Sequence, residues 1–210
     1  MNIPMTTIVA MQCDGFAVVG TDSRISSLDE DGYAFQYGTM ANNQAKITQN
    51  GKYLIGAAGD VRAINILQHV FQPPTPAPSL RGKKLDSFIT AKFISSLKSC
   101  FDEHGITHCG SKENQKTQQD SSIIAVINGC VYVIDTDFSW YTDASGIYSI
   151  GTGSQFALGA LNALQVKQKI SVTAAKRNCI KALTAAAKYD PFTGSPFQTF
   201  VQEADNNGRK

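Results

Sequence analysis

Residues 6 to 24, TTIVAMQCDGFAVVGTDSR, contain two apolar segments joined by a turn signal. The segments TTIVAMQ and GFAVVGT are rich in β-branched and apolar residues, which favour strands. The Asp-Gly pair at positions 14 and 15, which lies between them, is typical of a tight hairpin turn. The stretch therefore predicts an N-terminal β-hairpin that opens on a threonine pair and is followed by Asp22.

Only five residues precede Thr6, and their loss would make it the first residue of a mature chain. A terminal threonine carries nucleophile and base together, because its hydroxyl attacks a carbonyl while its α-amine, with an unperturbed pKa of about 7.7–8.0, takes the proton. Residues 1–5 are accordingly expected to be a short leader that is removed, and residues 6–210 a single domain. The leader could be lost in two ways. The chain could cleave itself before Thr6, or translation could start at Met5 and be followed by removal of that methionine. The second route is favoured.

The composition is that of one soluble globular domain of 210 residues, with 42% hydrophobic and 17% charged residues. The formal net charge of +2 argues against a nucleic-acid partner. No apolar run approaches the roughly 20 residues that span a bilayer, so no membrane partner is expected. A cytoplasmic location is expected because the cysteines are odd in number and lack the spacing of a disulfide scaffold or a zinc cluster. They are Cys13, Cys100, Cys109, Cys130 and Cys179.

Strands and helices are expected in alternating blocks along the rest of the chain. A polar segment at 26–38 follows the first hairpin. Strands are then expected at 44–48, 53–59, 122–127, 130–136, 146–150 and 196–201. Helices are expected in two pairs, at 62–70 and 84–104 and at 154–164 and 173–189. Residues 110–120 are expected to form a loop. Strand blocks separated by helix pairs favour an α+β fold, in which two stacked antiparallel sheets are flanked by helix pairs.

Six motifs spread over most of the chain carry a resemblance to a known family. They are TTIV at 6–9, TDSR at 21–24, the isolated Lys46, AAGD at 57–60, IGTGS at 150–154 and AAAKYDPFTG at 185–194. In these motifs and their order the chain resembles the proteasome β-subunit family, and its opening is most similar to the bacterial HslV-type peptidases. The resemblance implies the four-layer αββα sandwich of N-terminal nucleophile (Ntn) hydrolases.

The resemblance also implies the parts of an active site. Thr6 matches the nucleophile, and Asp22 and Lys46 match its charged neighbours. A threonine hydroxyl is a poor nucleophile at its free pKa, and a buried lysine kept protonated by a carboxylate supplies the cation that it needs. Gly59 matches the backbone donor for the oxyanion, and Ala57 is expected to line the pocket for the residue before the cut.

A second group of residues matches the family's outer group, which orients the α-amine. It consists of Thr152, Asp190 and Thr193. Two of these positions more often hold serine in the family, and threonine keeps the hydroxyl. The group is expected to accept hydrogen bonds from the ammonium that forms when the α-amine takes the proton of the Thr6 hydroxyl.

The hypothesis is a threonine-type endopeptidase that cleaves unfolded polypeptides through an ester acyl-enzyme and needs no cofactor. The resemblance implies a homo-oligomeric ring and leaves room for an ATP-dependent unfoldase. A noncatalytic ring or scaffold subunit and an Ntn amidohydrolase acting on small amides stay open as alternatives. His104, His108 and Cys109 form a cluster without a further paired ligand, so no metal site is expected. The connection from Arg24 to Lys46 is longer than in the HslV-type pattern.

Overall fold

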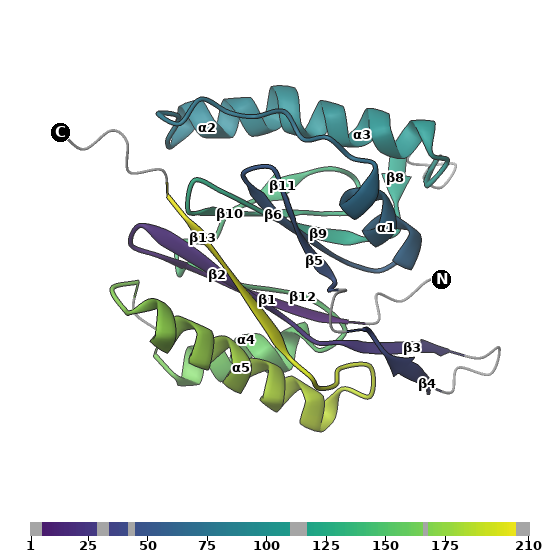
Figure 1. The fold of residues 1–210 in the computed structure, drawn as a ribbon, viewed down its shortest axis with the longest axis vertical. Coiled ribbons are helices and arrows are strands. Elements are labelled where there is room, and N and C mark those ends of the chain that lie inside the picture. The colour runs from purple at the N-terminus through teal and green to yellow at the C-terminus, as the bar shows by residue number, and fades with distance from the viewer. Residues whose placement is uncertain (1–5, 29–33, 42–44, 110–116, 166–167, 205–210) are drawn as a thin grey trace.

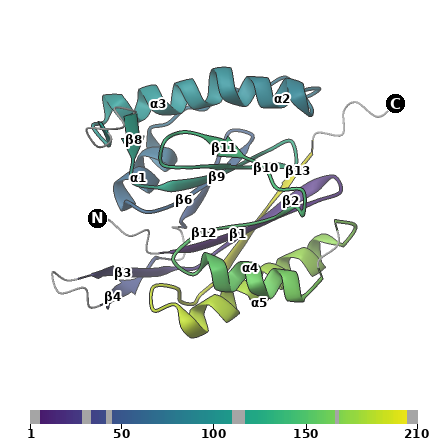
Figure 2. The ribbon, with the colours of Figure 1, turned by 180° about the vertical axis from the view of Figure 1, so that it is seen from behind.

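The computed structural model describes residues 6–28, 34–41, 45–109, 117–165 and 168–204. The leader expected at residues 1–5 lies outside this described part. Two antiparallel sheets are stacked on one another, and helices cover the outer face of each (Figure 1; seen from behind in Figure 2). The expected α+β class is therefore confirmed.

The four-stranded sheet contains the predicted N-terminal hairpin. Its strand order is β12-β1-β2-β13, with β1 at Thr7–Cys13, β2 at Phe16–Thr21, β12 at Ile147–Gly151 and β13 at Gln198–Glu203. In the hairpin Ile8 lies opposite Thr21 and Cys13 opposite Phe16. Gly15 has a φ of 85°, a conformation that glycine adopts without strain and that explains the Asp-Gly turn.

The five-stranded sheet contains a second hairpin, in which the predicted Asn-Gly turn joins β5 (Ile47–Asn50) to β6 (Tyr53–Ala58). Its order is β11-β10-β9-β6-β5, with β9 at Ser122–Ile127, β10 at Cys130–Ile134 and β11 at Trp140–Tyr141. All of its pairings are antiparallel. The sequence predicted these strands except β11, which has only two residues.

The helices agree closely with the predicted segments. The five-stranded sheet is covered by α1 (Val61–His69), α2 (Lys83–Phe88), the π-helical turn η1 (Ile89–Phe93) and α3 (Ile94–Glu103), and the four-stranded sheet by α4 (Ser154–Ala163) and α5 (Val172–Tyr189). Asp60 caps α1 as an extended residue whose side chain accepts a hydrogen bond from the Arg62 amide at 2.8 Å. None of the helices in the described part of the chain combines the length and apolar character needed to cross a membrane.

Three buried clusters follow one another through the stack. One lies between α1–α3 and the five-stranded sheet, one between the two sheets, and one between the four-stranded sheet and α4–α5. Strand β1 contributes to two of them, because successive side chains point to opposite faces. Ile8 and Ala10 pack between the sheets, whereas Val9 and Met11 pack against the helices. Burial on both faces explains why this strand is almost uninterruptedly apolar.

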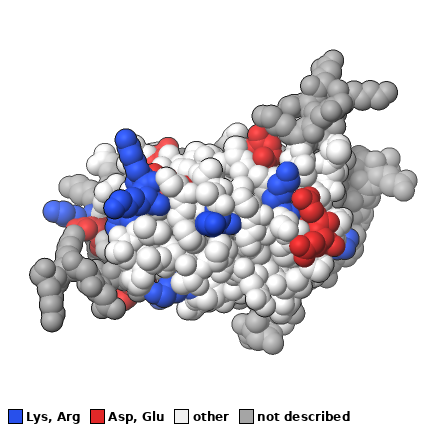
Figure 3. Space-filling view, turned by 90° about the horizontal axis from the view of Figure 1, so that it is seen from above, with Lys and Arg blue, Asp and Glu red and all other residues white. Residues whose placement is uncertain are grey.

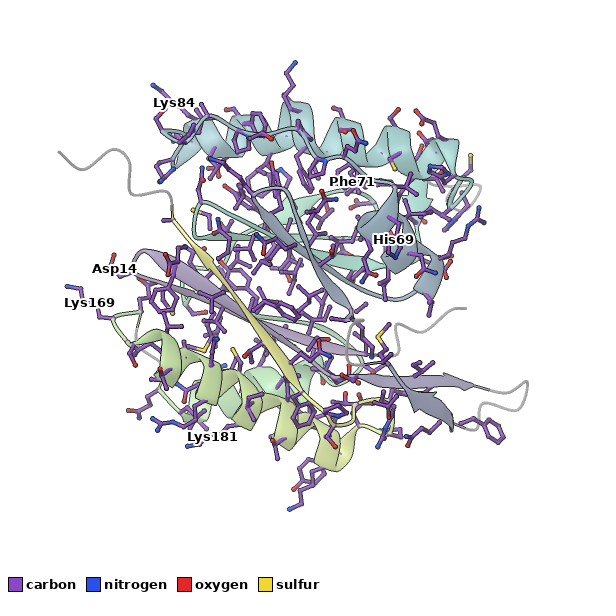
Figure 4. All side chains as sticks on the ribbon, in the orientation of Figure 1. Asp14, His69, Phe71, Lys84, Lys169 and Lys181 are labelled. Carbon is purple, nitrogen blue, oxygen red and sulfur yellow. The ribbon has the colours of Figure 1, made fainter. Side chains whose placement is uncertain are left out.

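Lysine side chains of the helices lie on the outside of this stack. Figure 4 shows Lys84 and Lys181 pointing away from the helices on the two outer faces, while Phe71 lies buried inside. On the face seen from above, basic and acidic side chains occur in small groups separated by uncharged surface (Figure 3). The described residues of this face therefore form no extended charged area of one sign.

Two polar regions contain strands that the sequence did not predict. Strands β3 (Arg24–Leu28) and β4 (Ala34–Thr39) form a hairpin that extends away from the sheets (Figure 1), where only an excursion was expected. Strands β7 (Thr107–Cys109) and β8 (Thr117–Gln119) pair where a loop was expected over 110–120, and that prediction was wrong for 117–119. Both pairs lack the continuous apolar run by which the buried strands were recognised.

Candidate active site

Sheet pairing brings the predicted site residues together from distant parts of the sequence. Because β1 and β2 are antiparallel, Thr6, directly before β1, lies beside Asp22, directly after β2. Thr7 pairs with Gly151, which places Thr152 at the same end of the sheet. Lys46, just before β5, reaches Asp22 from the other sheet.

Asp22 is the centre of the first half of the site, and it is completely buried. Its Oδ1 accepts from Lys46 Nζ at 2.8 Å, from the Thr7 amide at 3.1 Å and from Thr6 Oγ1 at 3.2 Å. Its Oδ2 accepts from the amides of Arg24 at 3.0 Å and Gly194 at 3.2 Å. Both oxygens are thus fixed by donors from separate segments, which sets the carboxylate's orientation toward Thr6.

Lys46 and the Thr6 hydroxyl share one partner, Asp22 Oδ1. The lysine is 5% exposed, and burial lowers the pKa of its ammonium, while the charge of Asp22 and the hydrogen bond to it act in the opposite direction. Thr6 is 2% exposed, so the pair lies in a region of low dielectric, where charge acts more strongly than in water. The electrostatic role of Lys46 stays a prediction.

The second half of the site is a network of hydroxyl groups around Asp190. Asp190 Oδ2 accepts from Thr152 Oγ1 at 2.9 Å and from Thr193 Oγ1 at 2.5 Å. Thr152 Oγ1 also lies 3.5 Å from the carbonyl oxygen of Thr6. Thr193 Oγ1 is in turn 2.5 Å from Thr7 Oγ1. The three residues of the predicted outer group therefore lie in one network beside Thr6, and Thr7 joins them.

Arg24 connects the two halves of the site. Its Nη1 donates to the carbonyl of Pro191 at 2.6 Å, and the Ser23 amide next to it donates to the carbonyl of Gly194 at 3.1 Å. These contacts hold the segment that carries Asp190 against the end of β2. Sequence reasoning assigned no site role to Arg24 or Thr7, since both roles depend on contacts with residues more than 160 positions away.

Gly59 lies at the end of β6 in a conformation that only glycine fits. Its φ is 146°, and a Cβ there would lie 2.4 Å from the carbonyl oxygen of Asp120 and 2.6 Å from Ser121 Oγ. Ser121 Oγ also accepts from the Asp60 amide at 3.1 Å, which fixes the chain directly after Gly59. The assignment of Gly59 as oxyanion donor stays a prediction.

Ala57 is fully buried and belongs to the cluster between the five-stranded sheet and its helices. The structure does not place its side chain beside Thr6, and its role in a substrate pocket stays a prediction. Within the described residues, no group of three His, Cys, Asp or Glu side chains is arranged to hold a metal ion. His108 Nε2 instead lies 3.7 Å from Asp120 Oδ1.

Many solved structures are similar to this chain, and three of them match it over nearly the whole length of both chains. Thiobacillus denitrificans BPH has a TM-score of 0.69 at 20% identity, with 96% of this chain and 100% of that chain covered. Thiobacillus denitrificans BPH in complex with Epoxomicin has a TM-score of 0.67 at 20% identity, with 94% and 98% covered. This chain has the fold of HslV- and proteasome-type peptidases.

Eukaryotic HslV from Trypanosoma brucei gives the same result, with a TM-score of 0.58, 21% identity and coverage of 94% of this chain and 99% of that chain. Neither a family model nor a curated sequence matches this chain. Because only 20–21% of the residues are identical, the similarity to these structures shows the fold and nothing finer. The family resemblance read from the motifs is confirmed at that level.

Replacing Gly153 by alanine tests whether the hydroxyl network must keep its geometry. A Cβ at Gly153 would lie 2.2 Å from Thr7 Oγ1 and 2.8 Å from Thr193 Oγ1, whereas its φ of −84° suits alanine. We expect Gly153→Ala to lower kcat/KM for peptide hydrolysis by about tenfold or more, since it displaces both hydroxyls.

Gly159→Ala is the matched control. It lies in α4 with open space around the added Cβ, so activity should be unchanged and stability higher by up to about 1 kcal/mol. Equal activity of both variants in the same peptidase assay would show that the network tolerates displacement.

Proposed function

We propose that the chain is an N-terminal threonine endopeptidase of the HslV type, in which Thr6 is the nucleophile. The observation that carries the proposal is that Asp22 Oδ1 accepts from both the Thr6 hydroxyl and Lys46 Nζ in a buried site. The fold shared with HslV- and proteasome-type peptidases supports it. By the same resemblance we propose that the helix-covered stack of sheets is the four-layer αββα sandwich of Ntn hydrolases.

In the proposed reaction the free α-amine of Thr6 takes the hydroxyl proton while Oγ1 attacks the peptide carbonyl. The Lys46 ammonium stabilises the negative charge that develops during the attack, and the Gly59 amide donates a hydrogen bond to the oxyanion. The ammonium is held by Asp190 and its hydroxyl partners. It then gives its proton to the leaving amine, which leaves an ester on Thr6. Water hydrolyses this ester and returns the enzyme to its starting state.

We further propose that the substrate is an unfolded polypeptide and that copies of the chain assemble into a ring. Support comes from the class of the structural neighbours and from the family resemblance. An ATP-dependent unfoldase and a cytoplasmic location belong to the same proposal. The chemistry at the Thr6 site itself requires no cofactor.

The proposed function is tested by incubating the chain with an unfolded protein and with fluorogenic peptides that differ in the residue before the cut. We expect cleavage of the unfolded protein and of peptides with a large apolar residue at that position, because Ala57 is small. A clear preference for acidic residues would contradict the assignment of Ala57. Hydrolysis of small amides without cleavage of peptides would favour an amidohydrolase. The absence of any hydrolysis would favour a scaffold subunit.

A further inference from the structure

We propose that Thr7, the residue after the nucleophile, is a positioning residue whose hydroxyl donates to Thr193 and so orients the group that receives the Thr6 amine. This inference rests on the function proposed above. Thr7 was not among the residues expected to form the site. Its side chain is completely buried and reaches a residue 186 positions away.

The two threonines at the start of β1 reach opposite halves of the site. Successive side chains of extended backbone point in opposite directions. Thr6 Oγ1 accordingly meets Asp22 at 3.2 Å, and Thr7 Oγ1 meets Thr193 at 2.5 Å. The threonine pair thus links the Asp22–Lys46 half to the half around Asp190.

The direction of the hydrogen bonds follows from counting protons. A hydroxyl has one proton to donate, and an ionised carboxylate has none. The proton of Thr193 is committed to Asp190 Oδ2, so Thr7 is the donor in its contact with Thr193. The chain of donation therefore runs from Thr7 through Thr193 to Asp190, and one lone pair of Thr193 stays available for the ammonium.

Thr7 is itself held rigidly, which makes it suitable for this role. Its amide donates to Asp22 Oδ1 at 3.1 Å, and its carbonyl accepts from the Asp22 amide at 3.2 Å. Gly153 packs so closely that a Cβ there would lie 2.2 Å from Thr7 Oγ1. A donor fixed in this way restricts the rotation of the Thr193 hydroxyl.

Loss of the Thr7 hydroxyl has a consequence that a purely structural role would not produce. Freed from its donor, Thr193 rotates and holds the ammonium on Thr6 less well. Weaker stabilisation of the charged form lowers the pKa of the amine. The amine is then deprotonated at lower pH, and the acid limb of the activity profile moves to lower pH.

The test compares Thr7→Val, which keeps the shape but removes the hydroxyl, with Thr7→Ser, which keeps the hydroxyl. We expect Thr7→Val to lower kcat about tenfold at an unchanged KM and to shift the acid limb downward, and Thr7→Ser to behave like the native chain. Thr7→Ala serves as a second variant without the hydroxyl. Ser149→Ala, which removes a buried hydroxyl bonded to the Ile8 carbonyl at 2.9 Å, controls for the loss of any buried hydrogen bond.

Native kcat and a native acid limb in a folded Thr7→Val variant would overturn the inference. If the native chain itself cleaves no peptide, the proposed function fails, and a crystal structure of Thr7→Val then decides on Thr7 alone. Displacement of Thr193 Oγ1 from Asp190 Oδ2 would support the positioning role. An unmoved Thr193 would overturn it.

Discussion

Replacing Thr6 by alanine is expected to reduce peptide hydrolysis by about 10⁴-fold or more, because it removes the attacking oxygen. The variant should still fold, with lower stability. Thr6 Oγ1 donates a hydrogen bond of 3.2 Å to the Asp22 carboxylate, and a hydrogen bond to a charged group contributes about 1.5–3 kcal/mol to the free energy of unfolding. Initial rates on a fluorogenic peptide, with thermal unfolding measured in parallel, check both statements.

Thr6→Ser is the matched control for this experiment. Serine keeps both the hydroxyl and the α-amine, so it should retain a measurable fraction of the native rate. A Thr6→Ala variant that cleaves as fast as the native chain would exclude Thr6 as the nucleophile. A native chain as inactive as Thr6→Ala would favour the noncatalytic scaffold.

The second large effect is expected at Lys46. Lys46→Met keeps most of the volume of the side chain but removes the cation beside Thr6, and we expect kcat/KM to fall by about 10³-fold. The variant also leaves Asp22 buried without its partner. Breaking a buried ion pair in this way typically costs about 3–5 kcal/mol of stability.

A double variant separates these two consequences. Lys46→Met combined with Asp22→Asn removes both charges, so part of the lost stability should return while activity stays low. The return is partial because the asparagine NH2 group cannot accept, and both Asp22 oxygens accept from backbone amides. Recovery of activity together with stability would mean that Lys46 acts only on the fold. The comparison requires rates and unfolding free energies for the single and double variants under the same conditions.

The pH dependence of the native chain's activity should also reveal the charge on Lys46. Burial lowers the pKa of Lys46, so its charge is lost at a lower pH than the roughly 10.4 of an ordinary lysine. Activity should therefore decline on the alkaline side below that value, because the neutral amine no longer stabilises the attacking oxygen. Lys46→Met should lack this alkaline limb.

The sequence predicted the buried elements well, because burial on both faces leaves a strong apolar pattern. Strands β1 and β2, the Asn-Gly hairpin and helices α4 and α5 were all expected within a few residues of their bounds. The hairpin of β3 and β4 was not, since it extends from the sheets and needs no apolar core face. The two-residue strand β11 is too short to produce any periodicity.

Within the site, the predicted residues belong to local motifs that the folded chain brings together. Asp22 bonds to Thr6 and Lys46, and Thr152 lies between Thr6 and the pair Asp190 and Thr193. Their catalytic roles stay predictions. Residues that act through distant contacts carry no such local signal. The side chains of Thr7 and Arg24 gain their partners only when the segment after α5 folds against β1 and β2.

The proposed function requires Thr6 to become a terminal residue with both a reactive hydroxyl and a free amine. An electrophile with two adjacent reactive centres can bond to a hydroxyl and an amine together only where one residue carries both. The deciding measurement is the intact mass of the protein produced from its native gene, before and after treatment with such a threonine-directed electrophile, with the adduct mapped by peptide mass. We predict a chain that begins at Thr6 and gains one adduct on its first residue. A dominant chain that begins at Met1 or Asn2 and gains no adduct would contradict the claim.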